Sequence, residues 1–229
     1  MGKTWSRMMT VDDLAHCIRC KAEVLRGVYW CWRGVIVGIR SGVGYGVLVL
    51  YPDHLAVGVD VTIQDYGYLH LLSARGIDIG SHTTIDRNLY LHCTYNKEEA
   101  HGWFAMGEHS FIGPNAVMGA SRGIQVGSHA RFAHDVVGSS EKSNCRPQSL
   151  LVKAAWLRQT GIVMGDDCWV GSPAVLLDSM CLSTGAVGAA CSVVTFDPPP
   201  YAIFGVVACF SRYWEDSKAI RCPMAGLPQ

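Results

Sequence analysis

A histidine and an aspartate stand next to each other at His134 and Asp135, and Glu141 follows shortly after them. Histidine is suited to act as a general base because its ordinary pKa lies close to neutral pH. A neighbouring carboxylate such as Asp135 can orient or tune the ring, and Glu141 can serve as a substitute base if burial raises its pKa. These residues predict proton removal from a hydroxyl or amine, with all three as candidate catalytic residues. A structural turn histidine is the alternative interpretation of His134.

The elements that would position these residues are repeated units of six residues. A large aliphatic or aromatic residue recurs at every sixth position, usually followed by a small one, as in Ile79–Tyr90, Met106–Gly123, Val126–Ser143 and Met164–Thr195. This pattern places one large side chain per short strand inside a narrow prism, while the small neighbour leaves room at the corner. Three units complete one coil, and each coil stacks on the last. The spacing predicts an all-β solenoid, the hexapeptide β-helix.

The same register sorts the histidines of the repeat region. His82, His109 and His129 occupy the fourth position of their units, where Asp167 also falls. That corner position often needs a left-handed backbone, which His, Asn and Asp tolerate better than most residues. We therefore interpret these three histidines as turn residues. His134 holds the third position of its unit, so the catalytic interpretation is kept for it.

The first part of the chain, residues 1–54, follows a different pattern. Apolar residues recur with helical spacing from Leu14 to about Trp32. Basic side chains are mixed with aromatic ones such as Tyr29 and Trp32. We interpret the segment as a helix packed on a larger body, with its basic residues in solvent. A helix lying on a membrane surface is the alternative interpretation.

Composition excludes several classes of protein. The 19 basic residues balance 19 acidic ones, so the chain lacks the basic footprint of a general nucleic-acid-binding protein. Hydrophobic residues make up 49% of the chain, which excludes charge-driven disorder. The first residues contain no apolar core of signal-peptide length, and no apolar stretch reaches the ~18 residues that span a bilayer. We therefore expect a cytoplasmic location.

Beyond these patterns, the repeat region resembles the left-handed β-helix acyltransferases, the hexapeptide-repeat family of sugar, serine and xenobiotic acetyltransferases. The stretches that carry the resemblance are Gly161–Leu177, Gly185–Thr195 and Asp197–Gly205. They are similar to the terminal coils of that family and to the exit of the chain after them. The resemblance implies a left-handed parallel β-helix that assembles as a homotrimer, with acetyl-CoA as acyl donor and active sites between neighbouring subunits. A saccharide is the acceptor favoured by analogy.

The resemblance also implies a division of the chain. The N-terminal helical segment takes up residues 1–54, and the β-helix takes up residues 55–205. A protruding loop at 144–160 interrupts the β-helix, and residues 206–229 form a C-terminal tail.

Site residues follow from the resemblance position by position. The string Ala133-His134-Asp135 resembles the Ala-His-Asp of the UDP-N-acetylglucosamine acyltransferase branch, whose histidine is the general base. In the galactoside and maltose acetyltransferase branch the catalytic histidine stands where this chain has Ser143. The positions that match those near the pantetheine arm of CoA in the family are Trp169, Gly171, Ser172, Gly188, Ala189, Ala190 and Thr195.

Two other functions share this fold and stay open. A γ-class carbonic anhydrase binds a metal through three histidines, and His129 and His134 show its H-x4-H spacing. However, the register places Ser139 where the second ligand should stand, so we expect no metal site. A non-catalytic trimeric scaffold is the second alternative, because Ser143 replaces a histidine and Phe196 replaces a lysine usual near the CoA phosphates.

Overall fold

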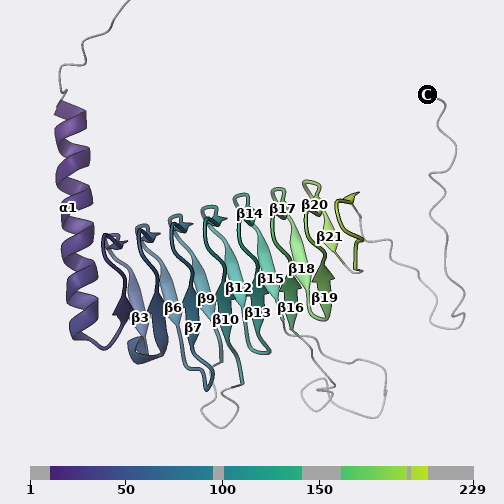
Figure 1. Ribbon diagram of the computed structural model, residues 1–229, viewed down its shortest axis with the longest axis horizontal. Helices are drawn as coiled ribbons and strands as arrows, with labels where there is room; N and C mark the ends of the chain where they lie inside the picture. The colour runs from purple at the N-terminus through teal and green to yellow at the C-terminus, as the bar shows by residue number, and fades with distance from the viewer. Residues whose placement is uncertain (1–10, 95–100, 141–160, 195–196, 206–229) are drawn as a thin grey trace, which may run out of the picture.

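The computed structural model describes residues 11–94, 101–140, 161–194 and 197–205, which form one helix and a solenoid of short parallel strands (Figure 1). The strands belong to three parallel sheets, and each complete coil contributes one strand to each sheet. This arrangement confirms the left-handed parallel β-helix that the six-residue spacing and the family resemblance predicted.

The bounds of the strands follow the repeat. The first sheet contains β1 (Ile36–Val37), β4 (Leu55–Val57), β7 (Ile77–Ile79), β10 (Phe104–Met106), β13 (Ile124–Val126), β16 (Ile162–Met164) and β19 (Met180–Leu182). The second sheet contains β2 (Gly42–Val43), β5 (Thr62–Ile63), β8 (Thr84–Ile85), β11 (Phe111–Ile112), β14 (Arg131–Phe132), β17 (Trp169–Val170), β20 (Val187–Gly188) and β22 (Ile203–Phe204). The third sheet contains β3 (Leu48–Leu50), β6 (Tyr68–His70), β9 (Tyr90–His92), β12 (Val117–Gly119), β15 (Val137–Ser139), β18 (Val175–Leu177) and β21 (Val193–Val194).

The core is a column of large side chains inside the prism. In the second sheet the residue that begins each six-residue unit is fully buried, as in Ile85, Ile112, Phe132 and Val170. Because strands of successive coils pair in parallel at equivalent positions, these side chains stack directly on one another. The column therefore gives every coil the same cross-section and holds the turns of successive coils in line.

Two sets of turns run along the prism and are named here by their place. The first edge joins the first sheet to the second, and the second edge joins the second sheet to the third. On the first edge His82, His109, His129 and Asp167 have backbone φ angles of 55° to 59°. These values lie in the left-handed region, which confirms the prediction that the three histidines are turn residues.

The solenoid begins earlier than the boundary at residue 55 that we expected. Strands β1 to β3 already belong to the three sheets, with Val37, Val43 and Val49 at the six-residue spacing. The spacing then breaks, because Tyr51 takes a left-handed backbone and a short 3-10 helix, Pro52–His54, follows before β4. This insertion is what made the first coil hard to recognise in the sequence.

Helix α1 (Val11–Trp32) lies across the open end of the first coil and ends at Trp32, as the sequence predicted (Figure 1). Trp30 is buried against this coil and lies over the apolar end of the core. Gly27 allows the close approach, since a Cβ there would lie 2.6 Å from the carbonyl oxygen of Ser41. The helix therefore packs on the solenoid, and it covers the first end of the core.

Two of the predicted features cannot be placed in this fold. The loop at 144–160 and the tail at 206–229 lie outside the described residues. Within the described part of the chain, no helix combines the length and the apolar composition needed to cross a bilayer.

Candidate active site

The second edge brings His134 and Asp135 together in the turn between β14 and β15. The Nδ1 atom of His134 lies 2.7 Å from Oδ2 of Asp135. Asp135 has a φ of 57°, so the fourth position of this turn is left-handed, as on the first edge. His134 precedes it at the third position, and its side chain projects from the edge with 61% of its surface exposed.

A row of polar side chains from earlier coils holds the carboxylate in place. The amide of Asn115 donates to the other oxygen of Asp135 at 3.0 Å, and Asn88 donates to Asn115 at 3.0 Å. Both asparagines occupy left-handed positions on the second edge. Each lies one coil before the residue to which it donates. The hydrogen bonds from His134 and then from Asn115 lower the pKa of Asp135 below its ordinary value, so it is ionised at neutral pH.

A serine hydroxyl from the following coil contacts the same nitrogen of His134. Ser172 occupies the third position of its turn, directly after β17, and its Oγ lies 2.8 Å from Nδ1 of His134. An ionised carboxylate can only accept a hydrogen bond, so Nδ1 of a neutral His134 carries the proton and donates it to Asp135. The other ring nitrogen, Nε2, then holds the lone pair.

This arrangement is one that can orient a general base. The carboxylate of Asp135 sets the tautomer and the direction of the ring, and it stabilises the imidazolium that forms when Nε2 accepts a proton. The sequence predicted His134 and Asp135 as partners, and the structure brings them into contact. It also places Ser172, which we expected near the CoA arm, beside the base.

Trp169 lies on the outer face of the second sheet, one strand away from His134. Its indole is half exposed, and it aligns with Arg131 of β14 on one side and Val187 of β20 on the other. Arg131 is exposed on the same face and stands three residues before His134. An aromatic and a cationic residue therefore lie side by side on the outer face of the second sheet, in the strands that precede the second edge.

The small residues expected near the donor have clear structural roles. A Cβ at Gly171 would lie 2.7 Å from the backbone nitrogen of Ala190, so the stacking of coils requires glycine there. The missing side chain of Gly188 leaves room for the ring of Phe204. The backbone nitrogen of Ala189 donates to Phe204 at 2.7 Å, and Ala190 is exposed. Their contact with a donor stays a prediction, and Glu141, Ser143 and Thr195 lie outside the described residues.

The histidine pair with H-x4-H spacing does not converge within one chain. His129 lies on the first edge, where its ring stacks on His109 with centroids 5.2 Å apart. His134 lies on the second edge, across the strand β14. Among the described residues, no group of His, Cys, Asp or Glu side chains is arranged to hold a metal ion.

Sequence reasoning missed Asn115 and Arg131. The signal for Asn115 was available, because it occupies the fourth position of its unit, as Asp135 does one coil later. Arg131 could have been found from its place on the strand before His134. Neither residue type indicates a site by itself. Asn115 becomes a candidate because it contacts Asp135, and Arg131 because it aligns with Trp169.

Comparison with known proteins finds likeness in structure alone. No family model matches the chain, and no curated protein matches its sequence. One similar structure is that of a mutant of AntD, an N-acyltransferase from Bacillus cereus, in complex with dTDP-4-amino-4,6-dideoxyglucose and coenzyme A. The identity is 13%, the match covers 76% of this chain and 80% of that chain, and the TM-score is 0.48.

A second similar structure is the UDP-N-acetylglucosamine acyltransferase from Campylobacter jejuni. Here the identity is 16%, the match covers 73% of this chain and 66% of that chain, and the TM-score is 0.42. The fold of this chain rests on its own three parallel sheets, and its chemistry has to be argued from the residues of the second edge.

Proposed function

We propose that this protein is an acyltransferase that moves an acetyl or other acyl group from CoA to a hydroxyl or amine, in the cytoplasm. The observation that carries the proposal is the contact of Asp135 with Nδ1 of His134, which leaves Nε2 free to accept a proton. The acceptor class, a saccharide, comes from the family resemblance of the sequence.

The chemistry follows from that geometry. Nε2 of His134 removes the proton from the acceptor hydroxyl or amine while its oxygen or nitrogen attacks the thioester carbonyl carbon. Backbone N–H groups can stabilise the oxyanion of the tetrahedral intermediate. When the carbonyl re-forms, the C–S bond breaks and the departing thiolate takes the proton from Nε2. The products are the acylated acceptor and CoA with a free thiol.

Acetyl-CoA is therefore a co-substrate in this proposal. The indole of Trp169 offers an apolar surface for the pantetheine arm, and the guanidinium of Arg131 offers a cation for the CoA phosphates. Their alignment on neighbouring strands supports this assignment, because both groups are exposed on the face that leads to His134.

We further propose a homotrimer in which a neighbouring subunit covers the second edge. His134 and Asp135 are exposed in a single chain, which leaves the reacting atoms open to water. The described strands of the third sheet, which border this edge, contain no Lys, Arg, Asp or Glu. A surface without charged residues is suited to contact with another subunit.

The test measures thiol release from acetyl-CoA in the presence of a panel of saccharide hydroxyl and amine acceptors. We expect acceptor-dependent release that the His134→Ala variant loses, while its binding of acetyl-CoA in calorimetry is kept. A purified protein that neither binds acetyl-CoA nor consumes it with any acceptor would exclude the acyltransferase and leave the non-catalytic scaffold.

A further inference from the structure

The side of α1 that faces away from the solenoid is apolar. Ile18, Leu25, Val28, Tyr29 and Trp32 lie on this side and are between 56% and 90% exposed, with Trp32 the most exposed of them. Intervals of seven, four and three residues connect Ile18, Leu25, Tyr29 and Trp32, which place them on one side of a helix. These five residues are called the outer face of α1.

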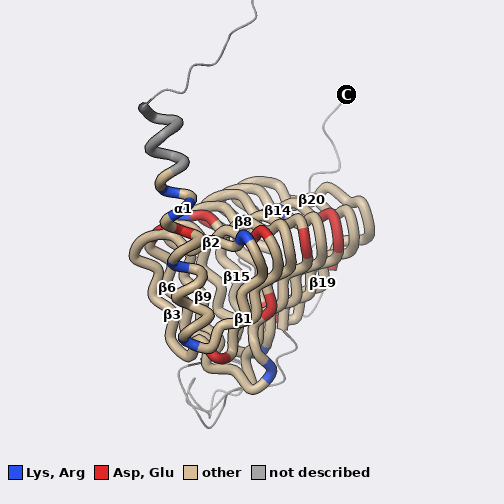
Figure 2. Tube along the Cα trace, turned by 60° about the vertical axis from the view of Figure 1, so that its left-hand side comes forward, with Lys and Arg blue, Asp and Glu red and all other residues tan. Residues whose placement is uncertain are grey.

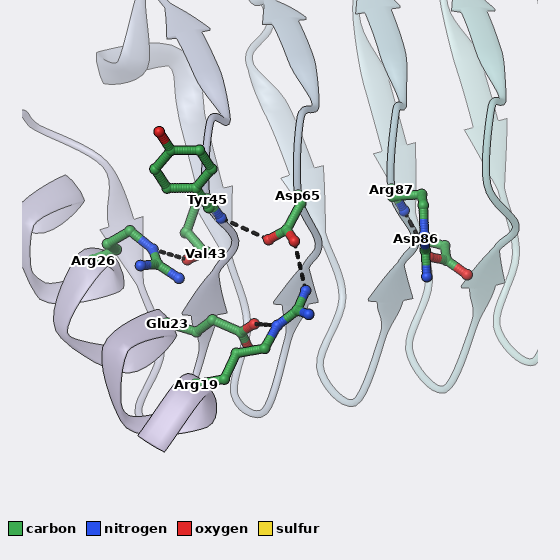
Figure 3. A network of polar contacts seen from close by, with 8 residues as sticks. All are labelled: Arg19, Glu23, Arg26, Val43, Tyr45, Asp65, Asp86 and Arg87. Carbon is green, nitrogen blue, oxygen red and sulfur yellow. Dashed lines mark hydrogen bonds and ion pairs between the residues drawn. The ribbon is translucent and has the colours of Figure 1, made fainter. Parts of the chain in front are cut away.

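Trp30 is buried on the opposite side of the helix, and polar contacts beside it hold the helix against the solenoid (Figure 3). Arg19 pairs with Glu23 at 3.0 Å and with Asp65, in the turn after β5, at 2.6 Å. Arg26 donates to the carbonyl of Val43 at 2.7 Å.

Apart from Trp30, the large apolar side chains that the structure describes on α1 lie away from the solenoid, whereas the apolar side of a surface helix usually faces the protein. The interpretation of the segment as a helix packed on a larger body is confirmed. The Arg19 side chain stays half exposed while it contacts the solenoid, and Arg26 is partly buried. Turning the outer face inward would break the contacts of Arg19 with Asp65 and of Arg26 with Val43. The apolar side chains are thus held in the solvent-facing position.

We propose that the outer face of α1 binds the surface of an anionic lipid bilayer. Trp and Tyr favour the boundary between headgroups and acyl chains, while Ile, Leu and Val favour the apolar side of that boundary. The helix lies on the bilayer in this proposal, in agreement with the finding that no described helix is fit to cross one.

The distribution of charge favours lipid as the occupant. The first 40 residues contain seven Lys and Arg against three Asp and Glu, and the rest of the neutral chain contains 12 against 16. Lys21 is exposed on α1 between the apolar positions, and several Lys and Arg segments lie at the α1 end of the solenoid in Figure 2. Arg19 and Arg40 are paired with carboxylates, and anionic headgroups attract the other exposed cations of this segment, such as Lys21. A second copy of this chain would instead bring two basic segments together, which like charge opposes.

The test uses the full-length protein and two kinds of vesicle, one of phosphatidylcholine alone and one with about 30 mol% phosphatidylglycerol. Co-sedimentation measures binding by wild type and by the double variant Leu25→Glu, Trp32→Glu. Ile203→Glu is the control for an added carboxylate, because it introduces one glutamate at an 81% exposed residue of β22, at the other end of the solenoid. All of these positions are exposed, so we expect unchanged circular dichroism and thermal unfolding.

We expect wild type and Ile203→Glu to bind the anionic vesicles, and the double variant to bind them at least ~10-fold more weakly. Lys21→Gln should weaken binding by a smaller factor and reduce its salt dependence. Equal binding by wild type and the double variant would overturn the proposal. So would a wild type that binds neither vesicle and sediments as an oligomer that the double variant dissociates. These measurements involve no acyl transfer, so their outcome is independent of the proposed function.

Discussion

His129 and His134 belong to the same coil and lie five residues apart, yet they occupy different edges of the solenoid. His129 takes the left-handed fourth position of its turn, and its ring stacks on His109, which stacks on His82 with centroids 4.7 Å apart. His134 takes the third position, and its ring contacts Asp135 and Ser172. On the first edge the histidines are turn residues, and of these His82 also lies 3.4 Å from a carboxylate oxygen of Asp60 in the previous coil. On the second edge the carboxylate stands next to the histidine in the same turn.

This difference teaches that register position governs what a histidine can do in this fold. At the fourth position the backbone conformation selects the residue, and the stack above and below restricts the ring. At the third position the backbone makes no such demand, and the fourth position beside it can supply a carboxylate. A histidine followed by Asp or Asn at the corner is therefore the pattern that can orient a base.

The largest expected effect is on catalysis, from the two histidines of this coil. His134→Ala should lower kcat by about 10²- to 10⁴-fold, the usual contribution of a general base. His129→Asn should leave kcat within about twofold, because Asn tolerates the left-handed backbone. Steady-state thiol release measures both. Similar losses in the two variants would show that the edges do not differ in function.

The next effect on kcat distinguishes two aspartates, Asp135 on the second edge and Asp167 on the first edge. Asp135→Asn keeps a left-handed corner but removes the charge that orients Nδ1 of His134, so we expect a loss in kcat of roughly ten- to a hundredfold. Asp167→Asn, at the equivalent left-handed position of the first edge, should leave kcat unchanged. A wild-type kcat in Asp135→Asn would remove Asp135 from the positioning role.

The fold could be predicted from sequence because the prism repeats one simple rule. A large residue at every sixth position, such as Ile112 or Phe132, fills the core, and small residues or left-handed turns close the corners. The rule failed where an insertion interrupted it. Strands β1 to β3 were missed because Pro52–His54 shifts the spacing before β4.

The site could be predicted only in part, since its contacts cross from coil to coil. The pair of His134 and Asp135 is local in sequence, so it was visible there. Asn115 and Ser172 lie 20 and 37 residues from Asp135 in the sequence. Only the stacking of the coils brings Asn115 to Asp135 and Ser172 to His134. The outward turn of the apolar side of α1 was also hidden, because it depends on where Asp65 meets Arg19.

A smaller effect on catalysis is expected from the hydroxyl that shares Nδ1 of His134. Ser172→Ala should lower kcat by about two- to tenfold, the equivalent of one neutral hydrogen bond. Ser128, at the third position of a turn on the first edge, provides the matched control, and Ser128→Ala should keep the wild-type rate. If Ser172→Ala instead raises KM for acetyl-CoA at constant kcat, Ser172 contacts the donor, as the family resemblance implied.

The smallest effect concerns stability and belongs to the first edge. Arg40 pairs with Asp60 there, and its hydrogen bond lowers the pKa of the Asp60 carboxyl below its ordinary value. A lowered carboxyl pKa contributes stability above the ordinary pKa, and this stability is lost as pH falls through the lowered one. Arg40→Asn suits the left-handed backbone of residue 40 and removes the pair.

We therefore expect the melting temperature of Arg40→Asn to fall slightly less than that of wild type between pH 7 and about pH 3. The difference should be small because the pair is exposed to solvent. Acyl transfer at neutral pH should be unchanged, since Asp60 lies on the edge without the base. A loss of activity in this variant would mean that the first edge acts on His134 through the strands of the second sheet, and the functional separation of the two edges would then be wrong.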